Sequence, residues 1–136
     1  MLQVLQPPDW AKPRGYANGM AFEMTAGSRI VFVGGQIGWN AQQRFETDDF
    51  ALQVRQTLEN IVAILAEGNA RPEHIVRMTW YVKNKREYVE SYPAIGEHYR
   101  AIIGRHFPAM TAVEVADLIE DEAKVEIEVT AVVPAA

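Results

Sequence analysis

The stretch His106-Phe-Pro-Ala-Met-Thr-Ala-Val-Glu-Val-Ala116, followed by Lys124-Val-Glu-Ile-Glu-Val-Thr-Ala131, decides the fold of this chain. A proline-led turn opens it, and two segments rich in β-branched residues follow. In the second segment the apolar residues point to one side of a strand, and Glu126 and Glu128 point to the other. An unpaired carboxylate is costly in a dry core. The acidic side must therefore face water, a cleft or a polar subunit boundary.

The size and composition are those of one soluble domain spanning residues 1–136. Apolar residues make up 49% of the chain and charged residues 23%, which argues against disorder. The prolines and glycines of residues 1–19 predict irregular structure, with 1–13 as an irregular lead-in to the domain. The first ten residues lack the basic start and apolar run of a signal peptide. We therefore expect a cytoplasmic protein with no membrane partner.

Several classes of function are disfavoured. The chain has no cysteine, so disulfides, thiolate metal sites and cysteine nucleophiles are excluded. His74, His98 and His106 do not have metal-ligand spacing, and we expect neither a metal nor any other cofactor. The net charge of −5 and the scattered arginines show no basic stripe, so we expect no nucleic-acid partner.

The remaining patterns predict the order β-β-α-β-α-β-β, an α+β fold. The apolar spacing of residues 48–67 predicts a helix, with Asp49 among its capping residues and Gly68 as a left-handed residue past its end. A second helix is predicted from Ser91 to about Arg105. The other predicted features are a hairpin of strands 20–24 and 29–33, a sharp bend at 34–38, a strand at 74–82, a polar turn at 83–86 and the two final strands.

This order and these motifs resemble the YjgF/RidA family of reactive-intermediate deaminases from about Arg14 to Val133. The resemblance implies a chorismate-mutase-like fold of the bacillary type, with a sheet backed by two helices. It also implies a homotrimer with small-molecule clefts between its subunits. The segments that carry it are Gly15-Tyr16, Val33-Gly-Gly-Gln-Ile-Gly38, Gln53-Val-Arg-Gln-Thr-Leu-Glu-Asn-Ile61, Ile75-Val-Arg-Met-Thr79, Tyr81-Val-Lys83, Phe107-Pro-Ala109, Val113-Glu-Val-Ala116 and Val125-Glu-Ile-Glu128.

The resemblance also implies a site. A glutamate matching Glu126 positions the water that attacks an imine carbon, and a tyrosine matching Tyr16 and the backbone around Gly35 and Gln36 complete the pocket. Family substrates are 2-imino acids or their enamines. In the alternative in which these residues have structural roles only, Glu126 is an exposed or ion-paired strand residue and Tyr16 is a half-buried aromatic. The glycine turn then serves only the backbone geometry.

The chain departs from the family pattern at the residue after Phe-Pro-Ala. Typical members carry there an arginine that grips the substrate carboxylate, and this chain has Met110. Either another cation, such as Arg14, Arg100 or Arg105, serves the cleft, or the ligand lacks that carboxylate. Three further family positions differ, namely Gly34, Gly96 and Ala112.

Three functions follow in order of preference. The first is hydrolysis of an imine or enamine to a carbonyl compound and ammonia, with non-standard substrate preference. The second is a non-catalytic trimer that binds a small apolar metabolite, with Trp39 and Met110 as walls, although packing explains both residues equally well. The third is an endoribonuclease or translation inhibitor, which the acidic balance disfavours.

Overall fold

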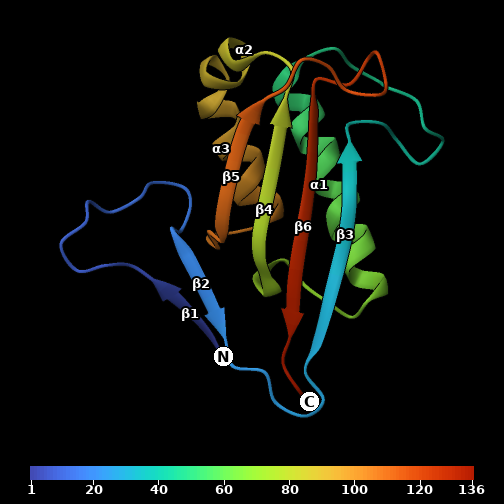
Figure 1. Ribbon diagram of the computed structural model, residues 1–136. Helices are drawn as coiled ribbons and strands as arrows, with labels where there is room; N and C mark the ends of the chain where they lie inside the picture. The colour runs from blue at the N-terminus through green and yellow to red at the C-terminus, as the bar shows by residue number, and fades with distance from the viewer.

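Strand β6 (Val125–Val133) lies in the middle of a four-stranded sheet of order β3-β6-β4-β5 in this computed structural model, which describes residues 1–136 (Figure 1). It pairs antiparallel with β3 (Arg29–Ile37) and with β4 (Ile75–Val82). The edge strand β5 (Ala109–Glu114) runs parallel to β4. The last two predicted strands, within residues 106–116 and 124–131, are thus β5 and β6 of one sheet.

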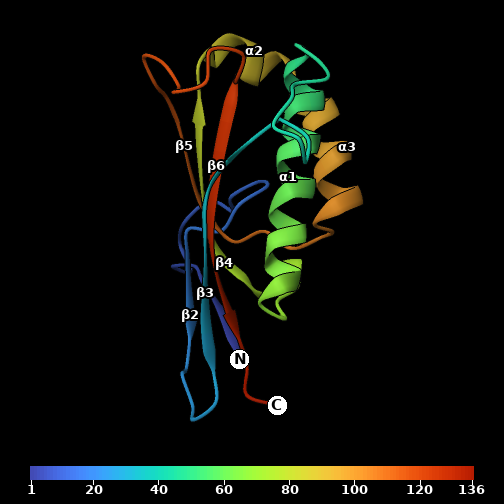
Figure 2. The ribbon, with the colours of Figure 1, turned by 90° about the vertical axis from the view of Figure 1, so that its right-hand side faces the viewer.

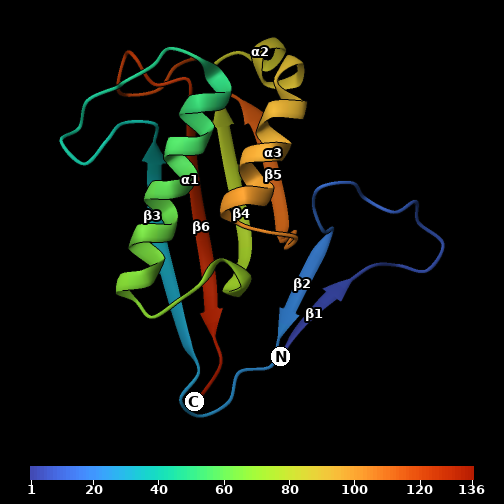
Figure 3. The ribbon, with the colours of Figure 1, turned by 180° about the vertical axis from the view of Figure 1, so that it is seen from behind.

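Two helices cover one face of this sheet and leave the other without a helix (Figure 2). Helix α1 (Phe50–Glu67) lies over β3 and β6, and α3 (Tyr92–Ile102) lies over β4 and β5 (Figure 3). A short helix α2 (Lys85–Glu90) follows β4. A 3₁₀ turn, Pro72–His74, directly precedes β4. The mixed α+β fold is therefore confirmed, and no helix is long and apolar enough to cross a membrane.

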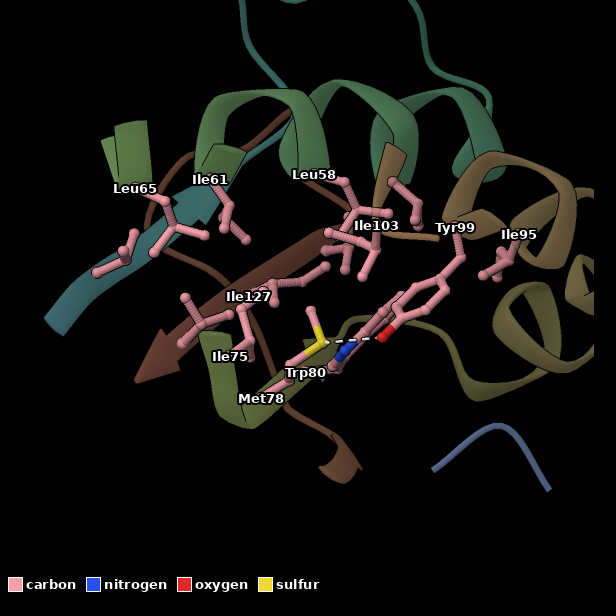
Figure 4. Close-up of a cluster of buried hydrophobic side chains, with 14 of the residues drawn as sticks. Leu58, Ile61, Leu65, Ile75, Met78, Trp80, Ile95, Tyr99, Ile103 and Ile127 are labelled. Atoms are coloured by element: carbon pink, nitrogen blue, oxygen red, sulfur yellow. Dashed lines mark hydrogen bonds between the residues drawn. The ribbon is translucent and has the colours of Figure 1, made fainter. Parts of the chain in front are cut away.

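The core fills the space between the helices and the sheet (Figure 4). Each fully buried aliphatic side chain in such a layer stabilises the fold by about 1.5–3 kcal/mol relative to exposure. The apolar stripe of α1 and the inward residues of α3 meet the alternate apolar positions of β6, as their spacing predicts. The main contributors are Val54, Leu58, Ile61, Leu65, Ile75, Met78, Trp80, Ile95, Tyr99, Ile103, Val125, Ile127 and Val129.

Local signals decide where α1 begins and ends. The carboxylate of Asp49 accepts a hydrogen bond from the Leu52 N–H at 3.0 Å, which confirms the predicted cap. The prediction for Gly68 was wrong in detail, because Gly68 keeps a negative φ and Asn69 adopts the left-handed conformation at φ 55°. Asparagine tolerates that region better than most residues, so the left-handed residue lies one position later than predicted, although the helix ends at Glu67.

A buried amide ties the start of β6 to α1. The Gln53 side chain is fully buried, accepts a hydrogen bond from the Lys124 N–H at 2.9 Å and donates one to the Glu122 carbonyl at 3.0 Å. Removing one partner of such a buried network costs about 1–3 kcal/mol. This contact holds the register at which Glu126 emerges from the sheet.

Three local predictions were wrong. The lead-in contains strand β1 (Leu2–Leu5), which pairs with β2 (Gly19–Phe22) in a separate two-stranded sheet. The expected hairpin between residues 20–24 and 29–33 is therefore absent, since its two strands belong to different sheets. The expected polar turn at 83–86 instead leads into α2, whose first turn Asn84 caps through the Glu87 N–H. A capping asparagine was the missed signal.

Candidate active site

A cavity of about 750 Å³ opens between the edge strand β5 and helices α2 and α3. Its floor comes from β4 and β5, its wall from the two helices, and its mouth from the segment 14–16. This volume is typical of a small-molecule site. The lining residues are Arg14, Gly15, Tyr16, Trp80, Val82, Lys85, Tyr88, Val89, Tyr92, Ile95, Gly96, Tyr99, Arg100, Phe107, Met110, Ala112, Val113 and Glu114.

Strand register explains why Met110 faces this cavity. Met110 is paired with Met78 and Ala112 with Trp80, and paired residues share a face of the sheet. Met78 and Trp80 point toward the helices, so Met110 and Ala112 do so too. The N-terminal segment reaches the same place because the Ala17 N–H donates to the Pro108 carbonyl at 3.0 Å. Tyr16 and Met110 are thereby brought together.

The cavity wall is largely aromatic. Tyr88 contacts the Trp80 ring at a centroid distance of 6.0 Å and meets Tyr92 edge-on at 5.1 Å. Tyr99 stacks on Phe107 at 5.6 Å. Tyr99 also donates to the His106 carbonyl at 2.6 Å, which fixes the turn before β5. Such a wall favours ligands with an aromatic or bulky apolar body.

Burial shapes the chemistry of these phenols. It raises the pKa of Tyr88 to about 12, with a smaller contribution from Tyr92. Burial likewise raises the pKa of Tyr99 far above its ordinary value. Both groups are therefore neutral hydrogen-bonding groups at neutral pH and do not act as bases there. The buried indole N–H of Trp80 has no hydrogen-bond partner in the protein.

The charges lining the cavity are mainly positive. Arg14, Lys85 and Arg100 lie on its surface, and Glu114 is the one carboxylate there. The Glu114 carboxylate accepts a hydrogen bond from the backbone N–H of Lys85 at 2.8 Å, so it braces the start of α2. Neither Arg14 nor Arg100 takes part in any of the four ion pairs of the molecule.

Glu126 lies on the other side of the sheet, outside this cavity. It pairs with Tyr81 on the face that no helix covers, is half-buried and takes part in none of the ion pairs. Its carboxylate rests against Gly35, where an added Cβ would overlap Oε2. The absence of a side chain at Gly35 therefore leaves room for the carboxylate beside β3.

The predicted bend is a bulge in β3. The pairing with β6 shifts between Val33 and Gln36, so Gly34 and Gly35 have no partner residues on β6. The Gln36 side chain donates back to the Gly34 carbonyl at 3.2 Å. Backbone groups of the bulge and the Glu126 carboxylate thus occupy one small area of the bare face.

The predicted site residues fall into two groups on opposite faces. Arg14, Tyr16, Arg100 and Met110 line the cavity, whereas Glu126 lies against Gly35 on the bare face, and the adjoining Gln36 is paired with Ile127 of β6. Two others belong to neither. Trp39 packs on Phe45 at a centroid distance of 5.9 Å, and Arg105 does not line the cavity.

The aromatic wall was missed from the sequence. Tyr92 and Tyr99 are seven residues apart on α3, a spacing that places them on one side of that helix, and Tyr88 joins them from α2. The expected polar turn at 83–86 concealed this pattern, because the helical region begins at Lys85.

Comparisons with known proteins agree with this architecture. The family model described as Endoribonuclease L-PSP matches residues 16–133. A protein of Escherichia coli strain K12 named 2-iminobutanoate/2-iminopropanoate deaminase is 34% identical over 106 residues, covering 76% of this chain and 79% of its own. A protein of Salmonella typhimurium with the same name matches to the same extent.

Solved structures give the same result. A Rid-family protein from Yersinia pestis, YyfB, superposes with a TM-score of 0.81 at 26% identity over 96% of this chain and 97% of that one. Rv2704 from Mycobacterium tuberculosis, a member of the YjgF/YER057c/UK114 family, has a TM-score of 0.62 at 28% identity, covering 88% of each chain. The fold and the matches together define an α+β protein of the Rid type. This chain belongs to the YjgF/RidA family.

Proposed function

We propose that this protein hydrolyses the imine or enamine of a bulky, apolar metabolite to a carbonyl compound and ammonia. The observation that carries the proposal is the contact between the Glu126 carboxylate and the β3 bulge at Gly35. A half-buried carboxylate free of ion pairs, lying against a strand bulge, is equipped to accept a proton from water. Relatives with 34% identity named as 2-iminobutanoate/2-iminopropanoate deaminases support the reaction class.

A homotrimer is part of this proposal. One chain holds Glu126 and the ligand-sized cavity on opposite faces of its sheet, so neither is complete alone. The bare face also exposes apolar side chains, including Ile30 at 50% and Phe32 at 76%. Packing this face against a neighbour would cover them and bring Glu126 of one subunit to the edge cavity of the next.

The proposed reaction follows from these groups. Glu126 accepts a proton from water while the water oxygen bonds to the imine carbon and the C=N π electrons move to nitrogen. The carboxyl group returns this proton to nitrogen, which gives a neutral tetrahedral intermediate. The carboxylate then takes the hydroxyl proton of this intermediate and passes it to nitrogen as the C=O bond forms, the C–N bond breaks and ammonia leaves. Tyr16, 41% exposed at the cavity mouth, donates a hydrogen bond to the substrate. No cofactor is needed in this sequence of steps.

Substrate preference follows from the cavity. Met110 and Ala112 are apolar, and the aromatic wall opposite them accommodates a ring. We therefore expect an imine derived from phenylalanine to be hydrolysed faster than one derived from alanine. The two imino acids can be generated by an amino-acid oxidase, and their loss and the ammonia released can be followed with purified protein.

The test of the active carboxylate is Glu126→Gln, which keeps the shape and removes the base. We expect the rate to fall by about 10²–10⁴-fold. Glu128→Gln is the matched control on the same strand face. Equal rates for wild type and Glu126→Gln would refute this role.

A second function, binding without turnover, is favoured by the fact that the cavity itself holds no free carboxylate. It predicts melting shifts with aromatic ligands and ammonia release no faster than in buffer. The same oxidase-coupled assay separates the two functions.

A further inference from the structure

Arg100 on α3 brings a positive charge to the cavity that Met110 also lines. Arg100 follows Gly96 by one helical turn, and its Nη1 lies 3.3 Å from the position that a Cβ on Gly96 would occupy. The guanidinium is therefore folded back along α3 over the glycine. A long side chain on a helix leans toward the N-terminus in this way. Here the lean places a cation on the cavity surface.

Arg14 brings a second guanidinium to the same cavity from a different part of the chain. It precedes Gly15, which adopts a positive φ of 77° and so turns the segment toward the mouth. Arg14 and Arg100 have no ion-pair partner, although acidic residues outnumber basic ones in the chain by 18 to 13. The one lining carboxylate, Glu114, already accepts a backbone hydrogen bond at the α2 end.

We propose that Arg14 and Arg100 form an anion seat that binds the carboxylate of the ligand, with Gly96 as the positioning residue for Arg100. This inference rests on the proposed function for the reaction, but the seat binds whether or not turnover occurs. A guanidinium offers a planar fork of donors that matches a carboxylate. The ligand class is an aromatic or bulky apolar body with a carboxylate at one end, approached from the α3 side of the cavity.

The experiment measures binding of two probes that share a body and differ in charge, 3-phenylpropanoate and 3-phenylpropanamide. Titration calorimetry on the wild-type protein should give a Kd about tenfold lower for the acid. Arg100→Gln and Arg14→Gln should each reduce this preference for the acid, expressed as the Kd of the amide divided by the Kd of the acid. The double variant should abolish the preference. Arg55→Gln, an exposed arginine paired with Glu59 on α1, is the control and should leave the ratio unchanged.

Gly96→Ala separates position from charge. Alanine favours helix over glycine, so the fold should be at least as stable, while the new Cβ crowds Nη1 of Arg100. We expect the preference for the acid over the amide to fall a few-fold, while the Kd of the amide stays unchanged. Raising the salt concentration should weaken acid binding alone, because the guanidiniums are exposed.

Each result decides the proposal. Equal affinities for acid and amide, no binding of either probe, or a preference that survives the double variant would overturn the seat. Imine hydrolysis without acid preference would retain the proposed reaction and discard the seat. Acid preference without ammonia release would retain the seat and discard the reaction.

Discussion

The edge cavity and the bare face of the sheet differ in what each can do. The cavity has volume, an aromatic wall and two unpaired guanidiniums, but its one carboxylate is engaged in bracing α2. The bare face has the unpaired Glu126 and a strand bulge, but no cavity in a single chain. Because β4 and β6 share one sheet, the alternation of strand residues forces these groups onto opposite sides. In the proposed function, a binding half and a chemical half thus lie on one chain without meeting, and the proposed homotrimer joins them.

Mixed trimers give the largest effect that tests this division. Glu126→Gln removes the base, and Ala112→Phe fills the cavity, so each pure variant should lose nearly all hydrolysis. After the two are denatured together and refolded in equal amounts, about a quarter of the clefts should combine two intact halves. Activity near a quarter of the wild-type value supports clefts shared between subunits.

The control for this experiment is each variant refolded alone at the same total concentration. A mixture as inactive as the pure variants, with random mixing shown by mass spectrometry, would contradict a shared cleft. Sedimentation of the wild type as a stable monomer at micromolar concentration would contradict it as well.

Two adjacent glycines provide the next test. Gly35→Ala places a methyl group where the Glu126 carboxylate lies, and that flexible side chain must move away. Gly34→Ala meets no atom within 4 Å, although both glycines belong to the same bulge. We expect Gly35→Ala to lower the hydrolysis rate by about 10²-fold, the scale of losing a positioned acid–base group. Gly34→Ala should remain near wild type, with similar melting temperatures for both. Equal activities of the Gly35→Ala and Gly34→Ala variants would show that Glu126 takes no part in the reaction.

Met110→Arg tests the cavity half alone. Arginine at this position restores the charge that family resemblance implies, in a strand that faces the aromatic wall. A charge-assisted bidentate contact contributes about 1.5–3 kcal/mol. The ratio of rates for an imine that carries a carboxylate and a matched imine that lacks it should therefore rise about tenfold. Met110→Leu should leave the ratio unchanged, and an equal change in both variants would point to packing instead of charge.

The sequence predicts most of the fold because its local signals agree with its tertiary contacts. The period-two alternation around Glu126 and the apolar stripe of α1 each point to one arrangement, and both are observed. The prediction of the strands at the start of the chain failed because four residues are too few to show a clear alternation of apolar and polar side chains. Their partners also depend on how distant segments meet.

The site was harder to predict than the fold. The family resemblance singled out Met110 as the residue at the position of the family arginine, and Arg14 and Arg100 as cations that could replace it, and all three line one cavity. Sequence alone could not show that Glu126 lies on the opposite face, since the pairing of β4 with β5 sets which side Met110 faces. The role of Gly96 was also hidden, because it depends on the rotamer of Arg100 one turn away.

Two tyrosines give the smallest effect and compare the two halves directly. On the bare face, the Tyr81 hydroxyl donates to the Glu128 carboxylate at 2.8 Å, and this hydrogen bond raises the pKa of Tyr81. On the cavity wall, burial raises the pKa of Tyr88 to about 12. The Tyr81 shift comes mainly from a hydrogen bond to a neighbouring carboxylate and the Tyr88 shift mainly from the loss of water, so they should respond to different changes.

Glu128→Gln should lower the pKa of Tyr81 toward its ordinary value, while that of Tyr88 stays near 12. For Tyr88 the neutral phenol is favoured in the folded protein. Its stabilising contribution is therefore complete below pH 10 and declines as pH rises from 10 to about 12. Tyrosinate absorbance and denaturant unfolding, with Tyr88→Phe as reference, measure both quantities. If Glu128→Gln shifts both titrations equally, the two faces are electrostatically coupled, and the separation of binding and chemical halves by the sheet is wrong.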